Sequence, residues 1–412
     1  MTPSLASVFA AVATKALVAV ELPQRGSHQH EINGASRLRE FFGGAKTSGE
    51  LRWHRFADDV EPLHASGKFT FYDARAKSAD RTGRSEWRMY YTGDFLAAAQ
   101  PGDLLALVRT RSEETHAFIF ERNSGWLRAA RVLFDVDPNA TLFRVFDEAA
   151  LDARVLEFVS ARILEELQLD VDVPAAPDHE AIASRELASA AAAGLSFPAT
   201  ARMAAVACEL AGEGGDADEL LLRRLETEER IFRAAERQLV DVKLREGFSG
   251  VDDFIAYSLS VQNRRKSRMG LALQNHLAEI FRANELRFSA QAYTENRKKP
   301  DFLFPGETEY RDAAFDASRL TMLAAKSSCK DRWTQVLPEA ERIAVKHLCT
   351  LEASISESQT DEMARQGIVL VVPRALHATY SASQRAQLLT VQQFIEHVRA
   401  LAKSADDVPC RA

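Results

Sequence analysis

Two stretches of this sequence hold residues whose types could together hydrolyse a phosphodiester bond. "KKPDFLFPG" places Asp301 at the start of an aromatic and aliphatic run, and "LTMLAAKSSCKDRWTQVLPEAE" contains Lys326 and Glu339. Phosphodiester hydrolysis needs a divalent cation on oxygen ligands, which polarises the phosphate and lowers the pKa of the attacking water. A nearby lysine orients the nucleophile and offsets charge in the transition state. Two carboxylates and a lysine at one point would therefore form a nuclease site that uses Mg²⁺.

The elements around these residues must bring them together. We expect Asp301 to begin one strand ("PDFLF"), Lys326 to end the next ("RLTMLAAKS"), and Glu339 to lie on the following helix ("DRWTQVLPEAERI"). Adjacent strand ends meet at one edge of a small sheet, and the helix would return Glu339 to that edge. Each part alone also fits a structural role, because Pro-Asp is a common turn dipeptide and a lysine at a strand end is usually solvated.

The second half of the chain predicts an α/β domain with a central mixed sheet. Further strands at "VKHLCTLEA" and "GIVLVVP" interleave with helices, of which "SASQRAQLLTVQQFIEHVRALA" is the last. Upstream, "DELLLRRLETEERIFRAAERQLVDVKLREGF" has the pattern of one long amphipathic helix. "VDDFIAYSLSVQNRRKSRMGLALQNHLAEIFRAN" favours two helices around a basic joint.

The first half has the pattern of short strands, which favours a compact β barrel or sandwich. Six segments carry it: "KFTFYDAR", "EWRMYYTG", "GDLLALVRT", "THAFIFERN", "GWLRAARVLF" and "ATLFRVFD". The N-terminal segment "MTPSLASVFAAVATKALVAVEL" lacks a basic leader and is interrupted by Lys15, so we interpret it as a core helix rather than a signal peptide.

A helix and a linker follow these strands and set the domain boundary. "EAALDARVLEFVSARILEELQL" switches to a helical period, with Leu151, Val155, Val159 and Ile163 on one face. "DVDVPAAPDHE" is rich in Pro and Asp. We therefore predict an N-terminal domain over 1–170, a linker over 171–180 and a C-terminal domain over 181–412.

Composition sets wide bounds on function. The chain has 412 residues, 46% hydrophobic and 27% charged, which suits two folded domains and argues against global disorder. The net charge of −7 counts only weakly against DNA binding, because a local basic face matters more than the sum. Four cysteines without a CxxC pair argue against a zinc site or a disulfide framework. With no apolar run of membrane-spanning length, we expect a soluble cytoplasmic protein.

Three motifs in the second half carry a family resemblance. "VQNRRKSRMG", "TENRKKPDFLFPG" and "LAAKSSCKDRWTQVLPEAERI" resemble the catalytic domain of EcoRII-type type II restriction endonucleases, within the PD-(D/E)XK nuclease superfamily. The similarity runs through most of residues 195–412. It implies that Asp301 and Glu339 are metal ligands and that Lys326 is the catalytic lysine. The acid that usually stands two places before this lysine is Ala324 here, and Glu339 takes its role, as in this family.

One departure from the family concerns the helix before the Pro-Asp strand. The family tends to carry a glutamate there, where this chain has Gln274. A neutral amide binds a cation less strongly than a carboxylate, so the departure bears on a second metal and on the tuning of the first.

The resemblance also implies contacts to double-stranded DNA. Lys330, Asp331 and Arg332 match the family's base-reading "KDR" element for C·G pairs, and their donors and acceptor suit guanine and cytosine edges. The alternative is a helix N-terminus with a surface ion pair. Phosphate contacts, or else solvated surface charge, are expected of Arg264, Arg265, Lys266, Arg268, Lys298 and Lys299.

Two polar loops in the first half resemble effector-binding segments of the family's N-terminal domain, a DNA-binding pseudobarrel. They are "RGSHQHEING" and "RTGRSEWR", and the implied DNA contacts are His28, Arg81, Arg84 and Glu86. The alternative is that the loops only connect strands. In this family a second copy of the recognition sequence binds the N-terminal domain and relieves its occlusion of the catalytic cleft.

Taken together, the resemblance implies a Mg²⁺-dependent type II restriction endonuclease that cuts a CCWGG-like site. It further implies a homodimeric catalytic domain and a cognate DNA methyltransferase in the same system. Two alternatives stay open: a repair or nicking nuclease of the same fold, and a DNA-binding protein whose nuclease domain is inactive.

Overall fold

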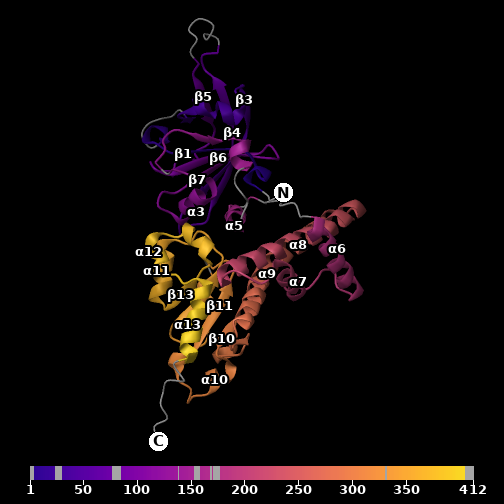
Figure 1. The fold of residues 1–412 in the computed structure, drawn as a ribbon. Helices are drawn as coiled ribbons and strands as arrows, with labels where there is room; N and C mark the ends of the chain where they lie inside the picture. Colours follow the sequence, from indigo (N-terminus) through magenta and orange to yellow (C-terminus); the bar gives the residue numbers. More distant parts are fainter. Residues whose placement is uncertain are drawn as a thin grey trace. The chain divides into compact units, whose positions relative to one another are not determined.

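The computed structural model describes residues 4–23, 30–76, 85–137, 139–152, 158–167, 169, 177–329 and 332–403. The chain divides into two compact units (Figure 1). The N-terminal unit comprises Met1–Val173 with two short later segments, Ala353–Glu357 and Ala378–Ser381. The C-terminal unit comprises Pro174–Glu352, Ser358–His377 and Ala382–Ala412.

The N-terminal unit is built on an eight-stranded sheet of order β2-β5-β4-β3-β7-β6-β1-β8. Its strands are β1 Phe9–Ala16, β2 Glu31–Ile32, β3 Thr47–Phe56, β4 Leu63–Asp73, β5 Trp87–Tyr91, β6 Leu104–Thr110, β7 Thr115–Phe120 and β8 Arg144–Phe146. Only β3 and β7 pair in parallel; the other neighbours are antiparallel. The sheet curls over a core that includes Leu51, Trp53, Phe71 and Met89. The protein is therefore of mixed α and β class, and the finer pseudobarrel assignment stays a prediction.

Two sequence predictions in this unit are wrong. The N-terminal segment is not a core helix, because Phe9–Ala16 forms β1 between β6 and β8. Nearly all of its side chains are buried, so the alternation that marks a strand is missing from the sequence. "GWLRAARVLF" is not a strand but helix α3, Gly125–Phe134, and Ser124 Oγ accepts a hydrogen bond from the Leu127 N–H at its start (3.0 Å).

The helical period after β8 is confirmed where the structure describes it. Helices α4, Glu148–Asp152, and α5, Phe158–Glu166, occupy this segment. Leu151, Val159 and Ile163 are buried as expected, and Val155 lies outside the described residues.

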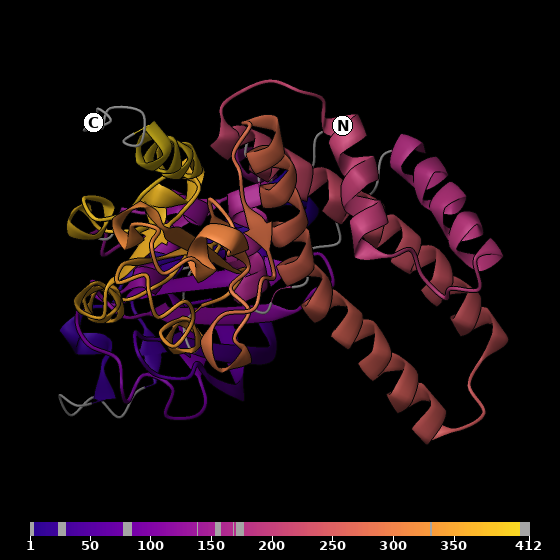
Figure 2. The ribbon, with the colours of Figure 1, turned by 90° about the horizontal axis from the view of Figure 1, so that it is seen from below.

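Long helices open the C-terminal unit. They are α6 Pro177–Ala192, α7 Thr200–Ala211, α8 Ala217–Glu246 and α9 Val251–Ala283, and α8 and α9 are seen as long rods in Figure 2. The single long helix predicted for α8 is confirmed. The predicted joint in the next segment is wrong, because α9 runs unbroken through Arg264–Arg268. That segment has no proline, and a basic run alone does not end a helix.

A five-stranded mixed sheet of order β13-β12-β11-β10-β9 lies at the centre of this unit, as predicted. Its strands are β9 Ser289–Ala290, β10 Phe302–Phe304, β11 Thr321–Lys326, β12 Lys346–Thr350 and β13 Ile368–Val371. β11 pairs antiparallel with β10 and parallel with β12. Aromatic contacts join α9, β10 and the last helix, α13 Val391–Lys403, through Phe281, Phe304 and Phe394.

Short helices complete the C-terminal part: α10 Glu307–Arg311, α11 Glu357–Arg365 and α12 Ala382–Arg385. The last predicted helix is divided into α12 and α13, because Leu389 between them forms a bridge with Val371 of β13. In the part of the chain that the structure describes, no helix is both long and apolar enough to cross a membrane.

Candidate active site

Asp301 and Lys326 lie side by side at one edge of the five-stranded sheet. Asp301 directly precedes β10 and is only 5% exposed, and Lys326 ends β11. Because these strands are antiparallel and pair Phe302 with Leu323, the start of one lies next to the end of the other. Asp301 Oδ2 accepts hydrogen bonds from the Ala325 N–H at 2.7 Å and from Lys326 Nζ at 3.2 Å.

Glu339 is near this pair but is not on the predicted helix. The segment forms only a short 3-10 helix, Trp333–Val336, and Glu339 lies in a bend beyond it. Pro338 has no N–H to donate to a helical hydrogen bond, and Ala340 has a positive φ of 49°, so the helix cannot continue. The prediction of a helix here is therefore wrong.

The Glu339 carboxyl group is buried. The residue is 9% exposed, and Oε2 has no hydrogen-bond partner among the described residues. Burial, which Lys326 opposes and the charge of Asp301 reinforces, raises the pKa of Glu339 to about 7. A buried carboxyl oxygen with no partner is a group that a cation could satisfy.

Hydrogen bonds hold the bend that carries Glu339. Glu295 accepts from the Tyr310 hydroxyl at 2.6 Å and from the Glu341 N–H at 3.2 Å. The Arg342 guanidinium donates to the backbone carbonyl groups of Asp312 and Phe315, each at 2.9 Å. The position of Glu339 is therefore fixed by its neighbours rather than by a regular helix.

Two glutamines complete the surroundings of Asp301. Its Oδ1 accepts from Gln274 Nε2 of α9 at 2.9 Å and from Gln291 Nε2 at 2.7 Å. The sequence analysis identified Gln274 only as a departure from the family, and it did not predict that Gln291 lies at the site. No local sequence pattern indicated Gln291, because its place next to Asp301 comes from the pairing of the two-residue strand β9 with β10 (Ala290 with Phe302).

The chemistry of this donor set suits a hard divalent cation. Carboxylate oxygens are the ligands that Mg²⁺ prefers, with water and phosphate oxygens filling the other positions. Asp301 and Glu339 are the residues that could hold it. In the described ranges, no group of three or more His, Cys, Asp or Glu side chains is placed to hold a metal ion.

The "KDR" element is described only in part. Arg332 is exposed, and its backbone N–H donates to the Cys329 carbonyl at 3.0 Å. Lys330 and Asp331 lie outside the described residues. An exposed Arg332 a few residues beyond Lys326 leaves its guanidinium available to a ligand.

The residues of the basic run on α9 differ in their exposure and in their contacts. Lys266 is exposed, whereas Arg264 lies over the Phe197 ring, 4.5 Å from its centroid. Arg265 pairs with Glu236 at 2.6 Å.

Arg268 is 5% exposed and pairs with Glu228 at 3.4 Å and with Glu229. Its guanidinium also lies over the Phe232 ring, 4.4 Å from the centroid. A phosphate contact by Arg268 would require these ion pairs to break, so its environment favours a packing role.

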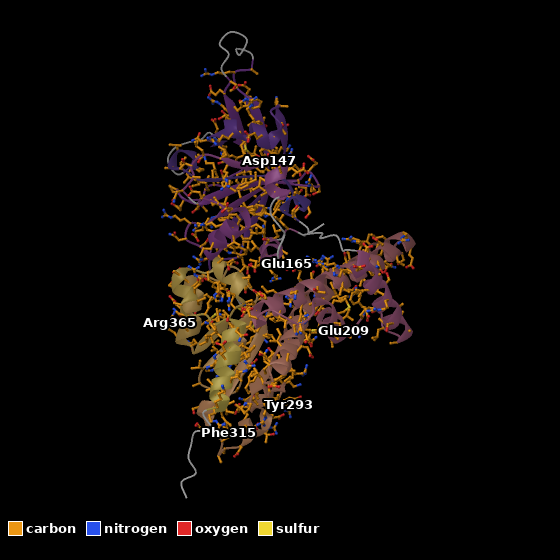
Figure 3. All side chains as sticks on the ribbon, in the orientation of Figure 1. Asp147, Glu165, Glu209, Tyr293, Phe315 and Arg365 are labelled. Atoms are coloured by element: carbon orange, nitrogen blue, oxygen red, sulfur yellow. The ribbon has the colours of Figure 1, made fainter. Side chains whose placement is uncertain are left out.

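Lys298 and Lys299 are both exposed. Lys299 Nζ lies 4.3 Å from the centroid of the Tyr293 ring, which is labelled in Figure 3. The charge of Lys298 lowers the pKa of Glu339, which places this lysine in the electrostatic surroundings of the site. Both side chains remain available for phosphates.

In the N-terminal unit, only Glu86 of the four predicted effector contacts is described. His28, Arg81 and Arg84 lie outside the described residues. Glu86 accepts hydrogen bonds from Arg88 Nε at 3.0 Å and Arg75 Nε at 2.6 Å, and these arginines hold its pKa below the usual range. A base contact by Glu86 would therefore compete with two arginines.

Comparisons with known proteins find similarity over the segment that contains these residues. Residues 232–395 match the family model described as EcoRII C terminal. The type II restriction enzyme EcoRII of Escherichia coli is 47% identical over 187 residues, which cover 45% of this chain and 46% of that enzyme. The aligned segment thus spans about half of the relative's length.

Two solved structures are also similar. Metal-depleted Ecl18kI in complex with uncleaved DNA has 18% identity and a TM-score of 0.44, with 56% of this chain and 86% of that chain covered. A PspGI restriction endonuclease–substrate DNA complex has 15% identity and a TM-score of 0.42, with 51% and 95% covered.

The family match contains every described residue of the candidate site. Gln274, Gln291, Asp301, Lys326 and Glu339 all fall within residues 232–395. The candidate site therefore lies within the part of the chain that matches the EcoRII C-terminal family model.

Proposed function

We propose that this chain is a type II site-specific deoxyribonuclease that hydrolyses phosphodiester bonds of double-stranded DNA. The observation that carries the proposal is the contact between Asp301 and Lys326 (3.2 Å) beside the buried Glu339 carboxyl group. All three lie in the segment that matches the EcoRII C-terminal family, and the curated relative is a type II restriction enzyme.

In the proposed mechanism, Asp301 and Glu339 are the residues that would hold Mg²⁺ at the edge of the sheet. When bound, the cation supplies a Lewis acid that polarises the phosphate and activates water. Lys326 Nζ donates one hydrogen bond to Asp301. It would donate a second hydrogen bond to the attacking water, and its positive charge would offset the charge on the phosphate. Glu339 would hold the cation in its ionised form, because a carboxyl group binds a metal only after it has lost its proton.

Sequence recognition is assigned to the segment just beyond the catalytic lysine. Lys330, Asp331 and Arg332 would read C·G pairs of a CCWGG-like site from the major groove. The exposure of Arg332 supports this role. Exposed Lys266, Lys298 and Lys299 would contact phosphates. Two copies of the domain, each reading half of the site, would form a homodimer.

The N-terminal unit is proposed to bind a second copy of the site and so regulate cleavage. Its contacts would come from the loops that contain His28 and Arg81–Glu86, of which the structure describes Glu86 and its paired arginines. Such an enzyme would act in the cytoplasm beside a methyltransferase that protects the host's own sites.

The deciding experiment is cleavage of unmethylated plasmid DNA in Mg²⁺, with the fragment ends sequenced. Asp301→Ala should abolish cleavage, and Asp361→Ala, which changes an exposed aspartate on α11, is the matched control. Discrete fragments with a common end sequence, lost only in Asp301→Ala, would establish the function and supply the site. Random degradation, or nicks in one strand, would favour a repair or nicking nuclease.

One observation favours an alternative, a DNA-binding protein with an inactive nuclease domain. Gln274 presents an amide to Asp301 where the family tends to have a carboxylate. Tight DNA binding without cleavage in Mg²⁺ or Mn²⁺, on substrates with several sites, would support this alternative. Recovery of cleavage by Gln274→Glu would then identify the cause.

A further inference from the structure

The Asp301 carboxylate has a hydrogen-bond donor at every acceptor position. Oδ1 accepts from Gln274 Nε2 at 2.9 Å and Gln291 Nε2 at 2.7 Å. Oδ2 accepts from the Ala325 N–H at 2.7 Å and Lys326 Nζ at 3.2 Å. A carboxylate offers about four lone-pair positions, so a cation can bind Asp301 only if one donor leaves.

Two of these donors are held by the fold, and a third is kept at the site by the proposed mechanism. The Ala325 N–H belongs to strand β11, and Gln274 is half-buried on α9 between the buried residues Leu273 and His276. Lys326 is needed at the site by the proposed mechanism. Gln291 is exposed, so its side chain can rotate into solvent.

The backbone keeps Gln291 at the site even when its side chain moves. Its N–H donates to the backbone carbonyl of Asp301 at 3.1 Å, and its φ is +53°. Its amide also lies 3.5 Å from Gln274 Oε1, so the two side chains form one network around Oδ1. The side chain can therefore leave Oδ1 and return without displacing the strand.

We propose that Gln291 is a positioning residue for Asp301, whose amide holds Oδ1 in the cation-free protein and leaves it when a divalent cation binds. This inference rests on the proposed function, because it concerns the same cation site. Gln274 keeps its hydrogen bond and maintains the carboxylate orientation. In the cation-free protein the Gln291 hydrogen bond prevents the Asp301 carboxylate from rotating. The same hydrogen bond competes with the cation for Oδ1.

This competition predicts changes in two measurable quantities, the affinity for the cation and the Mg²⁺ concentration that cleavage requires. Removing the Gln291 donor should tighten cation binding about tenfold, because a hydrogen bond to a charged group no longer has to be broken. The Mg²⁺ concentration that gives half of the maximal cleavage rate should fall by about the same factor, because the same donor competes with Mg²⁺ at Oδ1. A general loss of structure would instead weaken binding and lower the rate together.

The test is a titration of the full chain with Mn²⁺, without DNA, in which electron paramagnetic resonance reports the free ion. Wild type is compared with Gln291→Ala and Gln291→Glu, and Gln366→Ala, at an exposed glutamine after α11, is the matched control. Gln291→Glu removes the donor and adds a ligand, so it should bind Mn²⁺ at least as tightly as Gln291→Ala. Cleavage is then measured against Mg²⁺ concentration for each protein.

Tighter Mn²⁺ binding in both variants, with a lower Mg²⁺ concentration for half-maximal cleavage in Gln291→Ala, supports the proposal. Unchanged or weaker Mn²⁺ binding in Gln291→Ala overturns it, as does a wild type that binds no Mn²⁺. If the wild type binds Mn²⁺ but cleaves no DNA, the nuclease function fails, and the Mn²⁺ titration alone still decides the role of Gln291.

Discussion

Nζ of Lys326 lies 3.2 Å from Oδ2 of Asp301, although 25 positions separate the two residues in the chain. The antiparallel pairing of β10 and β11 accounts for this contact, because it sets the start of one strand against the end of the next. The ion pair is thus a direct product of the sheet.

Asp301→Asn should reduce DNA cleavage by more than about a hundredfold, since losing even an indirect partner of a metal site typically costs about 10- to 100-fold. The amide keeps the size of the side chain but removes the charge that binds the cation. Cleavage of plasmid DNA measures the rate, and gel-shift assays in Ca²⁺ measure DNA binding, which should persist. Full activity in this variant would remove Asp301 from the mechanism.

Glu339→Gln should make the metal-free protein more stable at pH 8 while it abolishes cleavage. The folded-state pKa of about 7 lies above the ordinary value of 4.5, so the ionised form is disfavoured by burial. This cost is absent below pH 4.5, grows as pH rises from 4.5 to 7, and levels off above pH 7 at about 3 kcal/mol.

Denaturant unfolding at pH 8 and pH 4.5 checks this stability prediction. The gain should appear only at pH 8, and Glu362→Gln, at an exposed carboxyl group on α11, should show none. Equal stability of Glu339→Gln and wild type at pH 8 would contradict the cost that we assign to burial.

Lys266→Ala and Arg268→Ala should separate DNA contact from packing within the basic run. Lys266 is exposed, so its loss should weaken DNA binding. The dependence of the binding constant on salt concentration should also become less steep, by the amount that corresponds to about one phosphate contact. Arg268→Ala leaves the buried Glu228 without this ion pair and should cost about 3–5 kcal/mol of unfolding free energy. Salt-dependent binding and denaturant unfolding of both variants make the test. If Arg268→Ala weakened DNA binding without lowering stability, Arg268 would instead be a phosphate contact.

Acid should destabilise the N-terminal unit through a chain of three histidines. His54 Nδ1 lies 2.8 Å from His64 Nδ1, and His54 Nε2 lies 3.0 Å from His116 Nδ1. Burial, then the charges of His116, His64 and Arg52, lower the pKa of His54 to about 3. Glu114, on the other side of His116, raises that neighbour's pKa but does not reverse its overall depression.

A depressed histidine pKa stabilises the folded state fully above pH 6.5, and this stability is lost as pH falls toward 3. Between pH 7.5 and pH 5 the His54 contribution should fall by about 2 kcal/mol. Thermal unfolding at the two pH values checks this, and His54→Gln should show a smaller difference than wild type. An identical pH dependence in the two proteins would show that His54 is not the responsible group.

Deleting residues 1–175 should yield a protein that cleaves a one-site substrate faster than the full chain does. The expected reason is that the N-terminal unit restrains the catalytic domain until a second site binds it. Rates on one-site and two-site plasmids, measured for both proteins, make the comparison. A truncated protein that folds but cuts a one-site plasmid no faster would exclude autoinhibition in this chain.

The sequence by itself determined the framework of the C-terminal unit. Short apolar runs beside Asp301 and Lys326 predicted β10 and β11, and the long charged amphipathic pattern predicted α8. These signals are local, because strand length, helical period and a Pro-Asp boundary are each read within a few residues. The meeting of Asp301 with Lys326 then followed from adjacent strand ends.

Only the tertiary structure decided how each polar group is used. Arg268 and Lys266 are chemically alike in sequence, yet one is buried among acids and the other is exposed. Gln291 gains its role from a two-residue strand, and β1 is hidden as a strand because both of its faces are buried. Burial and hydrogen-bond partners come from distant segments packing together, and for that reason no local pattern in the chain specifies them.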